Sequence, residues 1–173
     1  KVSYQQVDNN VEYSKKLLKD ITDQSKIIQQ NMSDIVWALK PDHDSIQAFE
    51  YRLREFSSKT LELEQINVRF DLSENTTKIV LPINIRKELV LIGKELLNNI
   101  SKHAFAKNVT ISFSHSQNHL FLKIEDDGIG ISDKAWTGSG IQNIQKRCQH
   151  LGGQFVMKNR HPGTESLVTI PLT

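Results

Sequence analysis

The stretch LFLKIEDDGIG, residues 120–130, decides the fold of this 173-residue chain. An apolar strand, residues 120–124, runs into two aspartates and two glycines, and glycine lets the backbone turn sharply and approach a ligand closely. An ionised aspartate only accepts hydrogen bonds. Asp126 at the strand end could therefore accept one from the exocyclic amine of adenine, and it would repel the carbonyl of guanine. The plainer interpretation is an ordinary Asp-Gly turn.

A polar helix face precedes this strand. The pattern predicts a helix over residues 83–104, on which Glu95, Asn99 and Lys102 follow the spacing i, i+4, i+7 and so share one face. A carboxylate and an amide one turn apart offer oxygen ligands to a hard cation such as Mg²⁺. Lys102 and His103 come one turn further along, where they could contact phosphate. A solvated polar face is the alternative interpretation.

A glycine-rich segment follows the strand. Gly138, Ser139 and Gly140 open a helix predicted over residues 140–151, and backbone amides at such a helix start bind phosphate. The spacing is not that of a P-loop, and the third glycine of a dinucleotide-binding fingerprint is missing. We predict that two glycines, residues 152–153, end this helix.

The predicted elements follow the order two helices, strand, helix, hairpin, helix, hairpin. The strands are predicted at residues 66–72, 108–114, 119–126, 153–159 and 165–171. Because most of them come in antiparallel pairs, we expect an α+β fold in which helices cover one face of a mixed sheet.

The first forty residues carry a different pattern. Residues 4–39 contain no glycine or proline, and apolar residues recur at alternating steps of three and four for about five heptads. The pattern is typical of a long helix that packs along other long helices, and an amphipathic helix lying on its own domain is the alternative. Pro41 is expected to stop this helix, and Ser45 to cap a second one.

The composition of the chain is that of an ordinary globular protein. Apolar residues make up 38% of the chain and charged residues 24%, which excludes a wholly disordered chain, a collagen and a membrane bundle. The net charge of +2 and its mixed distribution do not predict nucleic-acid binding. No stretch approaches the ~20 apolar residues of a transmembrane helix. The single cysteine, Cys148, fits a reducing, intracellular compartment and is expected to be a small buried group.

In this order, the motifs resemble the catalytic ATP-binding domain of bacterial two-component sensor histidine kinases, within the Bergerat-fold ATPase superfamily. Residues 94–104, KELLNNISKHA, are similar to the Asn box of the short-lid kinases, and residues 126–130 and 138–147 to their glycine boxes. Residues 32–41, MSDIVWALKP, resemble the end of their dimerisation helix and the following hinge. The resemblance covers residues 11–173.

The resemblance implies a Bergerat-type two-layer α/β sandwich preceded by a coiled-coil-like dimerisation helix. It divides the chain into residues 1–40 as the second helix of a dimerisation and phosphotransfer bundle, 41–45 as a hinge and 46–173 as the catalytic domain. It also implies a short lid at residues 131–139, in which Trp136 either covers the nucleotide or packs on neighbouring helices.

The implied ligands are ATP and Mg²⁺. Glu95 and Asn99 would be the catalytic pair, with Asn99 holding Mg²⁺ and Glu95 orienting water or metal. The residues that would bind the nucleotide are Asn99, Lys102, His103, Asp126, Gly128, Gly130, Gly138, Ser139, Gly140, Ile141 and Thr164.

The phosphoacceptor histidine is expected to lie outside this sequence. The family carries it on the first helix of the dimerisation hairpin, whereas residues 4–39 resemble the second helix and contain no histidine. His43 and Asp44 fit the family's dipeptide superficially, but they follow Pro41 in a connection. The remaining candidates are expected to be surface or strand residues without metal-ligand spacing, namely His115, His119, His150 and His161.

The resemblance therefore predicts the cytoplasmic core of a sensor histidine kinase whose full-length protein could be membrane-anchored. The core would dimerise through its N-terminal helix and phosphorylate a histidine on an upstream helix, for relay to the receiver domain of a response regulator. Two alternatives stay open. One is a protein-serine kinase of the anti-sigma type, against which the long helix argues. The other is a non-catalytic nucleotide-binding module, against which Glu95 and Asn99 argue.

Overall fold

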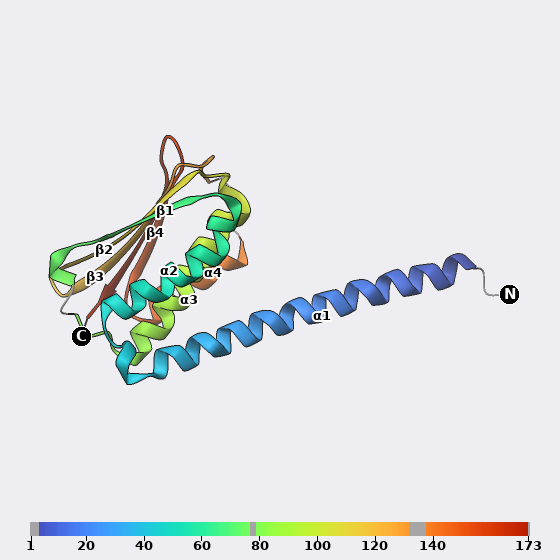
Figure 1. Ribbon diagram of the computed structural model, residues 1–173, viewed down its shortest axis with the longest axis horizontal. Coiled ribbons are helices and arrows are strands. Elements are labelled where there is room, and N and C mark those ends of the chain that lie inside the picture. The colour runs from blue at the N-terminus through green and yellow to red at the C-terminus, as the bar shows by residue number, and fades with distance from the viewer. Residues whose placement is uncertain (1–3, 77–78, 132–137, 173) are drawn as a thin grey trace. The chain divides into compact units, whose positions relative to one another are not determined.

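The computed structural model describes residues 4–76, 79–131 and 138–172 (Figure 1). The chain separates into two compact units, residues 1–37 and 38–173. Helix α1 (Tyr4–Leu39) makes up the described part of the first unit and extends into the start of the second. Its 36 residues confirm the helix predicted over residues 4–39.

Helix α1 leaves its apolar stripe exposed. Five side chains of the predicted seam have exposed fractions between 48% and 64%, namely Val11, Leu18, Ile21, Ile28 and Met32. Burying an apolar side chain contributes about 1.5–3 kcal/mol, and none of these five obtains that contribution within this chain. Among the described residues, no helix is long and apolar enough to cross a bilayer.

The second unit is built on a five-stranded mixed sheet, as predicted. The strands are β1 (Asn67–Leu72), β2 (Asn108–Ser116), β3 (His119–Asp126), β4 (Gln154–Asn159) and β5 (Thr164–Pro171). Their order is β1-β2-β3-β5-β4. β1 pairs parallel with β2, and the other three pairings are antiparallel.

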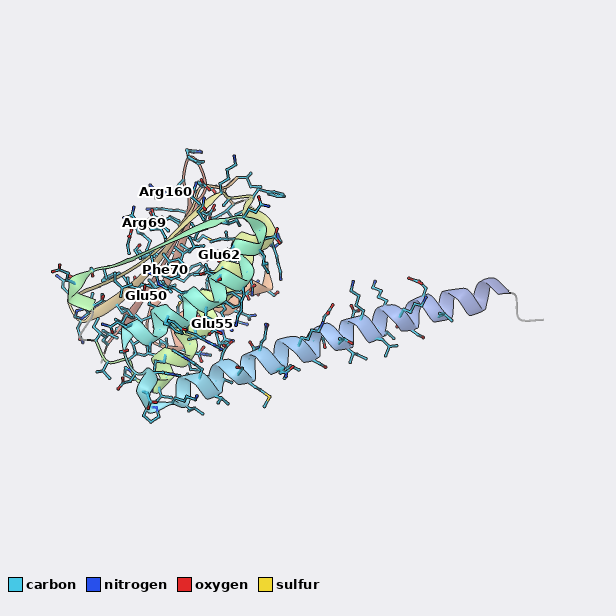
Figure 2. All side chains as sticks on the ribbon, in the orientation of Figure 1. Glu50, Glu55, Glu62, Arg69, Phe70 and Arg160 are labelled. Atoms are coloured by element: carbon cyan, nitrogen blue, oxygen red, sulfur yellow. The ribbon has the colours of Figure 1, made fainter. Side chains whose placement is uncertain are left out.

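Three helices cover one face of this sheet, as Figure 1 shows: α2 (Ile46–Thr60), α3 (Ile83–Asn99) and α4 (Ser139–His150). The inward positions of β3 alternate with half-exposed ones, so that Leu120, Leu122 and Ile124 are at most 2% exposed. Phe49 of α2 meets Phe113 of β2 edge to face, with 5.5 Å between ring centroids. α2 also carries charged residues, including Glu50 and Glu55, which Figure 2 labels.

Two predicted boundaries differ from the structure by more than one residue. β2 continues to Ser116 because Gln117 and Asn118 both take positive φ, which gives a two-residue turn that matches the twist of a hairpin. The α-helix predicted over residues 83–104 is regular only to Asn99 and ends in one π-turn (Ile100–Ala104). Such π-turns inside helices frequently occur at functional sites.

The segment after α1 is hydrogen-bonded to the segment that leads into α3. Pro41–His43 form one turn of 3₁₀-helix, and Ser45 caps α2 by accepting a hydrogen bond from Ala48 N at 3.1 Å, as predicted. The Asp44 carbonyl accepts from Leu81 N at 2.6 Å. The Lys40 carbonyl accepts from Arg86 Nη1 at 2.8 Å, and Arg86 is 3% exposed.

Candidate nucleotide-binding site

The predicted acidic and amide side chains of α3 lie against the start of α4. A Cβ atom added to Gly140 would overlap Glu95 Oε1, and it would lie 3.2 Å from Glu95 Cδ and 3.7 Å from Asn99 Oδ1. Only glycine fits this close approach without a shift of the helices or of the Glu95 side chain. Two motifs more than forty residues apart in the sequence are therefore brought together.

The donor set on α3 fits Mg²⁺ as the family resemblance implies. Asn99 Nδ2 is buried and, within the described residues, has no hydrogen-bond partner. Nitrogen and oxygen of such a carboxamide are assigned by their partners, so the oxygen of Asn99 can equally take this unpartnered position. Within the described residues no cluster of three or more His, Cys, Asp or Glu side chains could hold a metal. Glu95 and Asn99 therefore offer two oxygen ligands at most. This small number suits Mg²⁺, which takes its remaining ligands from phosphate oxygens and water.

The carboxylate of Asp126 lies at the buried end of β3. Asp126 is 8% exposed, and its Oδ1 accepts a hydrogen bond from Gly128 N at 2.9 Å. Burial raises the pKa of Asp126, and hydrogen bonds from Gly128 and from the Thr164 backbone and hydroxyl oppose that rise. Thr164 is the cross-strand partner of Asp126 on β5 and is also 8% exposed. The predicted adenine-reading residue and the predicted threonine are therefore neighbours.

Asp127, the next residue, has a different role that the sequence did not indicate. Its Oδ1 accepts from Lys107 N at 2.7 Å and Asn108 N at 2.8 Å, and its Oδ2 accepts from Asn108 Nδ2 at 2.7 Å. The hydrogen bonds from Asn108 and Lys107 outweigh desolvation and lower the pKa of Asp127. Asp127 therefore anchors the start of β2.

The backbone of residue 104 joins the two parts of the site. The Ala104 carbonyl ends the π-turn, five residues after Asn99, and accepts a hydrogen bond from Ile129 N at 2.9 Å. A Cβ atom added to Gly128 would overlap the same carbonyl oxygen, so the loop after β3 packs closely on the end of α3. This contact fixes Asp126 relative to the helix that carries Glu95 and Asn99.

Asn159, at the end of β4, is a further residue that the sequence motifs did not reveal. Its Oδ1 accepts from Ile131 N at 2.5 Å, and its Nδ2 donates to Ile131 O at 3.1 Å. The amide thus pairs with the backbone next to Gly130 as a neighbouring strand would. Arg160, which Figure 2 labels, forms an ion pair with Glu125 of β3.

The other predicted site residues lie at the margin of these contacts. Lys102 and His103 are exposed on the π-turn, and Gly138 and Ser139 are exposed at the start of α4. Ile141 is buried, with 6% exposed. Their contact with a nucleotide stays a prediction. Trp136 and most of the predicted lid, residues 132–137, lie outside the described residues.

Cys148 is not placed for chemistry. It is fully buried in α4, and burial raises the pKa of its thiol to about 11, so the reactive thiolate is disfavoured at neutral pH. The prediction of a small buried group is confirmed.

Comparison with known proteins identifies the class to which this fold and site belong. The model of the histidine kinase-, DNA gyrase B- and HSP90-like ATPases matches residues 84–173. The chain belongs to this ATPase family. The matched region begins at the second residue of α3 and contains both glycine motifs.

Named relatives point to one branch of that family. The histidine-protein kinase/phosphatase UhpB of Salmonella typhimurium is 33% identical over 126 residues, which is 72% of this chain and 24% of UhpB. The sensor histidine kinase ComP of Bacillus subtilis is 28% identical over 143 residues, 76% of this chain and 19% of ComP. The chain thus spans a quarter or less of these curated relatives.

The solved structure of the histidine kinase AdeS from Acinetobacter baumannii has the same fold. Its TM-score is 0.68 at 18% identity, over 91% of this chain and 84% of that one. The predicted α+β fold and the resemblance to a histidine-kinase ATP-binding domain are confirmed.

Proposed function

We propose that this chain is the kinase core of a sensor histidine kinase. It binds ATP with Mg²⁺ and transfers the γ-phosphoryl group to a histidine on a helix that packs along α1. The phosphoryl group then passes to an aspartate in the receiver domain of a response regulator. The observation that carries the proposal is the close approach of Gly140 to Glu95 and Asn99, which sets backbone amides for phosphate beside oxygen ligands for a metal.

Asp126 selects the base in this proposal. Its ionised carboxylate accepts a hydrogen bond from the adenine amine, and it has no donor for the carbonyl of guanine. Gly128 and Thr164 hold the carboxylate in place through their hydrogen bonds to it. Gly130 and the Asn159–Ile131 pairing hold the loop beside the base.

The phosphates extend from the base toward the start of α4. The amides of residues 138–141 and the cationic side chains of Lys102 and His103 neutralise their charge, and Asn99 supplies a metal-ligating oxygen with Glu95 beside it. Bound Mg²⁺ would add further neutralisation of charge on the transferring group. Phosphoryl transfer needs mainly such positioning and charge stabilisation.

The transfer step itself is a displacement at the γ-phosphorus. A nitrogen lone pair of the acceptor imidazole forms the N–P bond while the bond to the β,γ-bridging oxygen breaks, and ADP leaves with that electron pair. Reacting atoms about 3–3.5 Å apart are required, which a histidine held on a packed helix can satisfy. Helix α1 has no histidine at any position, so the acceptor belongs to a different helix.

The exposed seam of α1 supports a homodimer. A stripe of apolar residues sustained for about five heptads is buried most simply against a second copy of the same helix within a bundle. The response regulator would dock on that bundle to receive the phosphoryl group. A cytoplasmic location follows from the use of ATP and agrees with the single reduced cysteine.

The proposal is tested by phosphorylation with γ-labelled Mg²⁺-ATP. Residues 1–173 alone should form no stable phosphohistidine, and addition of a histidine-containing fragment from the upstream helix should produce acid-labile, base-stable label on that fragment. Asn99→Ala should lower the labelling rate by about 100-fold or more, the scale of losing one electrostatic contact in a transition state, with Asn98→Ala as the matched control. Label on the segment alone that His43→Ala removes would overturn the acceptor assignment.

A further inference from the structure

An ion pair links α3 and α4 at the end of the helix pair away from the nucleotide site. Arg147 Nη1 lies 2.5 Å from Glu88 Oε2, and the two side chains are 34% and 16% exposed. They are 59 positions apart in the sequence. Glu88 lies outside the motifs discussed above, and Arg147 is the last residue of the glycine-box segment 138–147.

The position of this pair relative to Gly140 is informative. Glu88 precedes Glu95 by seven residues on α3, and Arg147 follows Gly140 by seven residues on α4. Seven residues are about two helical turns, or about 10.5 Å along the axis, so each helix presents both of its contacts on one face. Gly140 contacts Glu95 while Arg147 contacts Glu88, so the two helices run antiparallel and touch at two points two turns apart.

The face between these two points is apolar and tightly packed. Ile144 of α4 lies one turn after Gly140 and is 1% exposed, and Ile92 of α3 lies one turn after Glu88 and is fully buried. Apolar packing of this kind has no direction and tolerates sliding better than polar contacts do. A screw shift of α4 by one residue, which advances the helix about 1.5 Å and turns it about 100°, would bring Ser139 or Ile141 to the place where a Cβ on Gly140 already overlaps Glu95.

We propose that the Glu88–Arg147 ion pair is a positioning device for ATP binding. It fixes the register of α4 on α3, and through that register it holds the amides at the start of α4 against Glu95 and Asn99. Both residues are positioning residues, because they act on the phosphates through α4. The inference rests on the proposed nucleotide site and adds two residues that govern its affinity for phosphate.

The proposal predicts an effect on phosphate binding that a purely structural ion pair would not have. Removing the pair loosens the start of α4, which faces the phosphates, and leaves the base contacts of Asp126 on β3 unchanged. ATP affinity should therefore fall while adenosine affinity stays the same. Loss of one coupling contact of this kind typically changes an affinity by about 2- to 30-fold.

The experiment uses the full chain and measures binding of Mg²⁺-ATP by calorimetry and of adenosine by NMR titration. Glu88→Gln and Arg147→Gln should each weaken Mg²⁺-ATP binding about fivefold or more and leave adenosine binding within about twofold. The double exchange Glu88→Arg with Arg147→Glu should restore much of the ATP affinity, because it re-forms the pair with opposite polarity.

Glu50→Gln is the matched control. Glu50 of α2 is 15% exposed and pairs with Arg54 Nη2 at 2.6 Å, so the variant loses a similar ion pair away from α4. Its ATP affinity should equal that of the wild type. Unchanged ATP affinity in Glu88→Gln and Arg147→Gln, or an equal loss of ATP and adenosine binding, would overturn the inference. A wild-type chain that binds neither ligand would instead overturn the proposed nucleotide site.

Discussion

Helix α1 and the second unit, residues 38–173 (the catalytic unit), treat their apolar residues in opposite ways. In the catalytic unit the large side chains of Phe49, Leu53 and Phe113 are at most 1% exposed. On α1, Leu18 and Ile28 are 64% and 60% exposed although the sequence pattern there is equally regular. Regular apolar spacing therefore predicts that a helix face will be buried. It does not predict whether the surface that buries this face belongs to the same chain. The catalytic unit buries its apolar core within itself, whereas the seam of α1 is exposed.

The largest expected effect tests this contrast directly. Leu53→Ala removes buried methyl groups from the core and should lower the free energy of unfolding by about 2–5 kcal/mol. Ile28→Ala on the exposed seam should change the unfolding of the catalytic unit by less than about 0.5 kcal/mol but weaken self-association. Urea unfolding measures the first quantity and sedimentation equilibrium the second. The contrast fails if Ile28→Ala destabilises the catalytic unit as much as Leu53→Ala does.

A smaller effect concerns the carboxylate that the catalytic unit buries. The pKa of Asp126 is raised by burial, so the folded state binds this proton more tightly than the unfolded chain. The contribution of Asp126 to stability should therefore decrease as pH rises from the ordinary aspartate value through its raised value. ATP binding should increase over the same interval, because the ionised carboxylate is the stronger acceptor for the adenine amine.

Asp126→Asn isolates this pH dependence. The lowered pKa values of Asp127, Glu55 and Glu165 act in the opposite direction, because their stabilisation is lost as pH falls. Melting temperature and ATP affinity are measured for wild type and variant across acidic pH. The contributions of Asp127, Glu55 and Glu165 are common to both proteins and cancel in the difference. Identical pH profiles for the two proteins would contradict the assignment.

The sequence predicted those parts of the molecule that depend on local pattern. The bounds of α1, the Ser45 cap and the strand that ends at Asp126 follow from periodicity, capping chemistry and glycine placement. The π-turn was missed because residues 100–104 are as compatible with a regular helix as with a wider one. The end of β2 was missed because Gln117 and Asn118 form the hairpin turn without glycine.

Contacts between distant segments could not be predicted in this way. The Asn159–Ile131 and Glu88–Arg147 pairs join residues 28 and 59 positions apart, and nothing local distinguishes these side chains from other surface residues. Asp126 and Asp127 are adjacent and chemically identical, so only the fold separates the one that faces the site from the one that anchors β2. Resemblance to a family singles out Asp126 as the residue that would read adenine, which stays a prediction, and the structure was needed to find the contacts of Asp127.

The central claim is that Asp126, and not Asp127, reads the adenine base. Calorimetry of nucleotide binding to variants of these two aspartates tests it most directly. The account predicts that wild type prefers ATP to GTP and that Asp126→Asn loses ATP affinity at least severalfold, because a buried polar partner left unsatisfied costs about 1–3 kcal/mol. Asp127→Asn should bind ATP within about twofold of wild type while melting at a lower temperature, since it weakens the three hydrogen bonds that anchor β2. Equal ATP affinities for wild type and Asp126→Asn, or equal affinities of wild type for ATP and GTP, would contradict it.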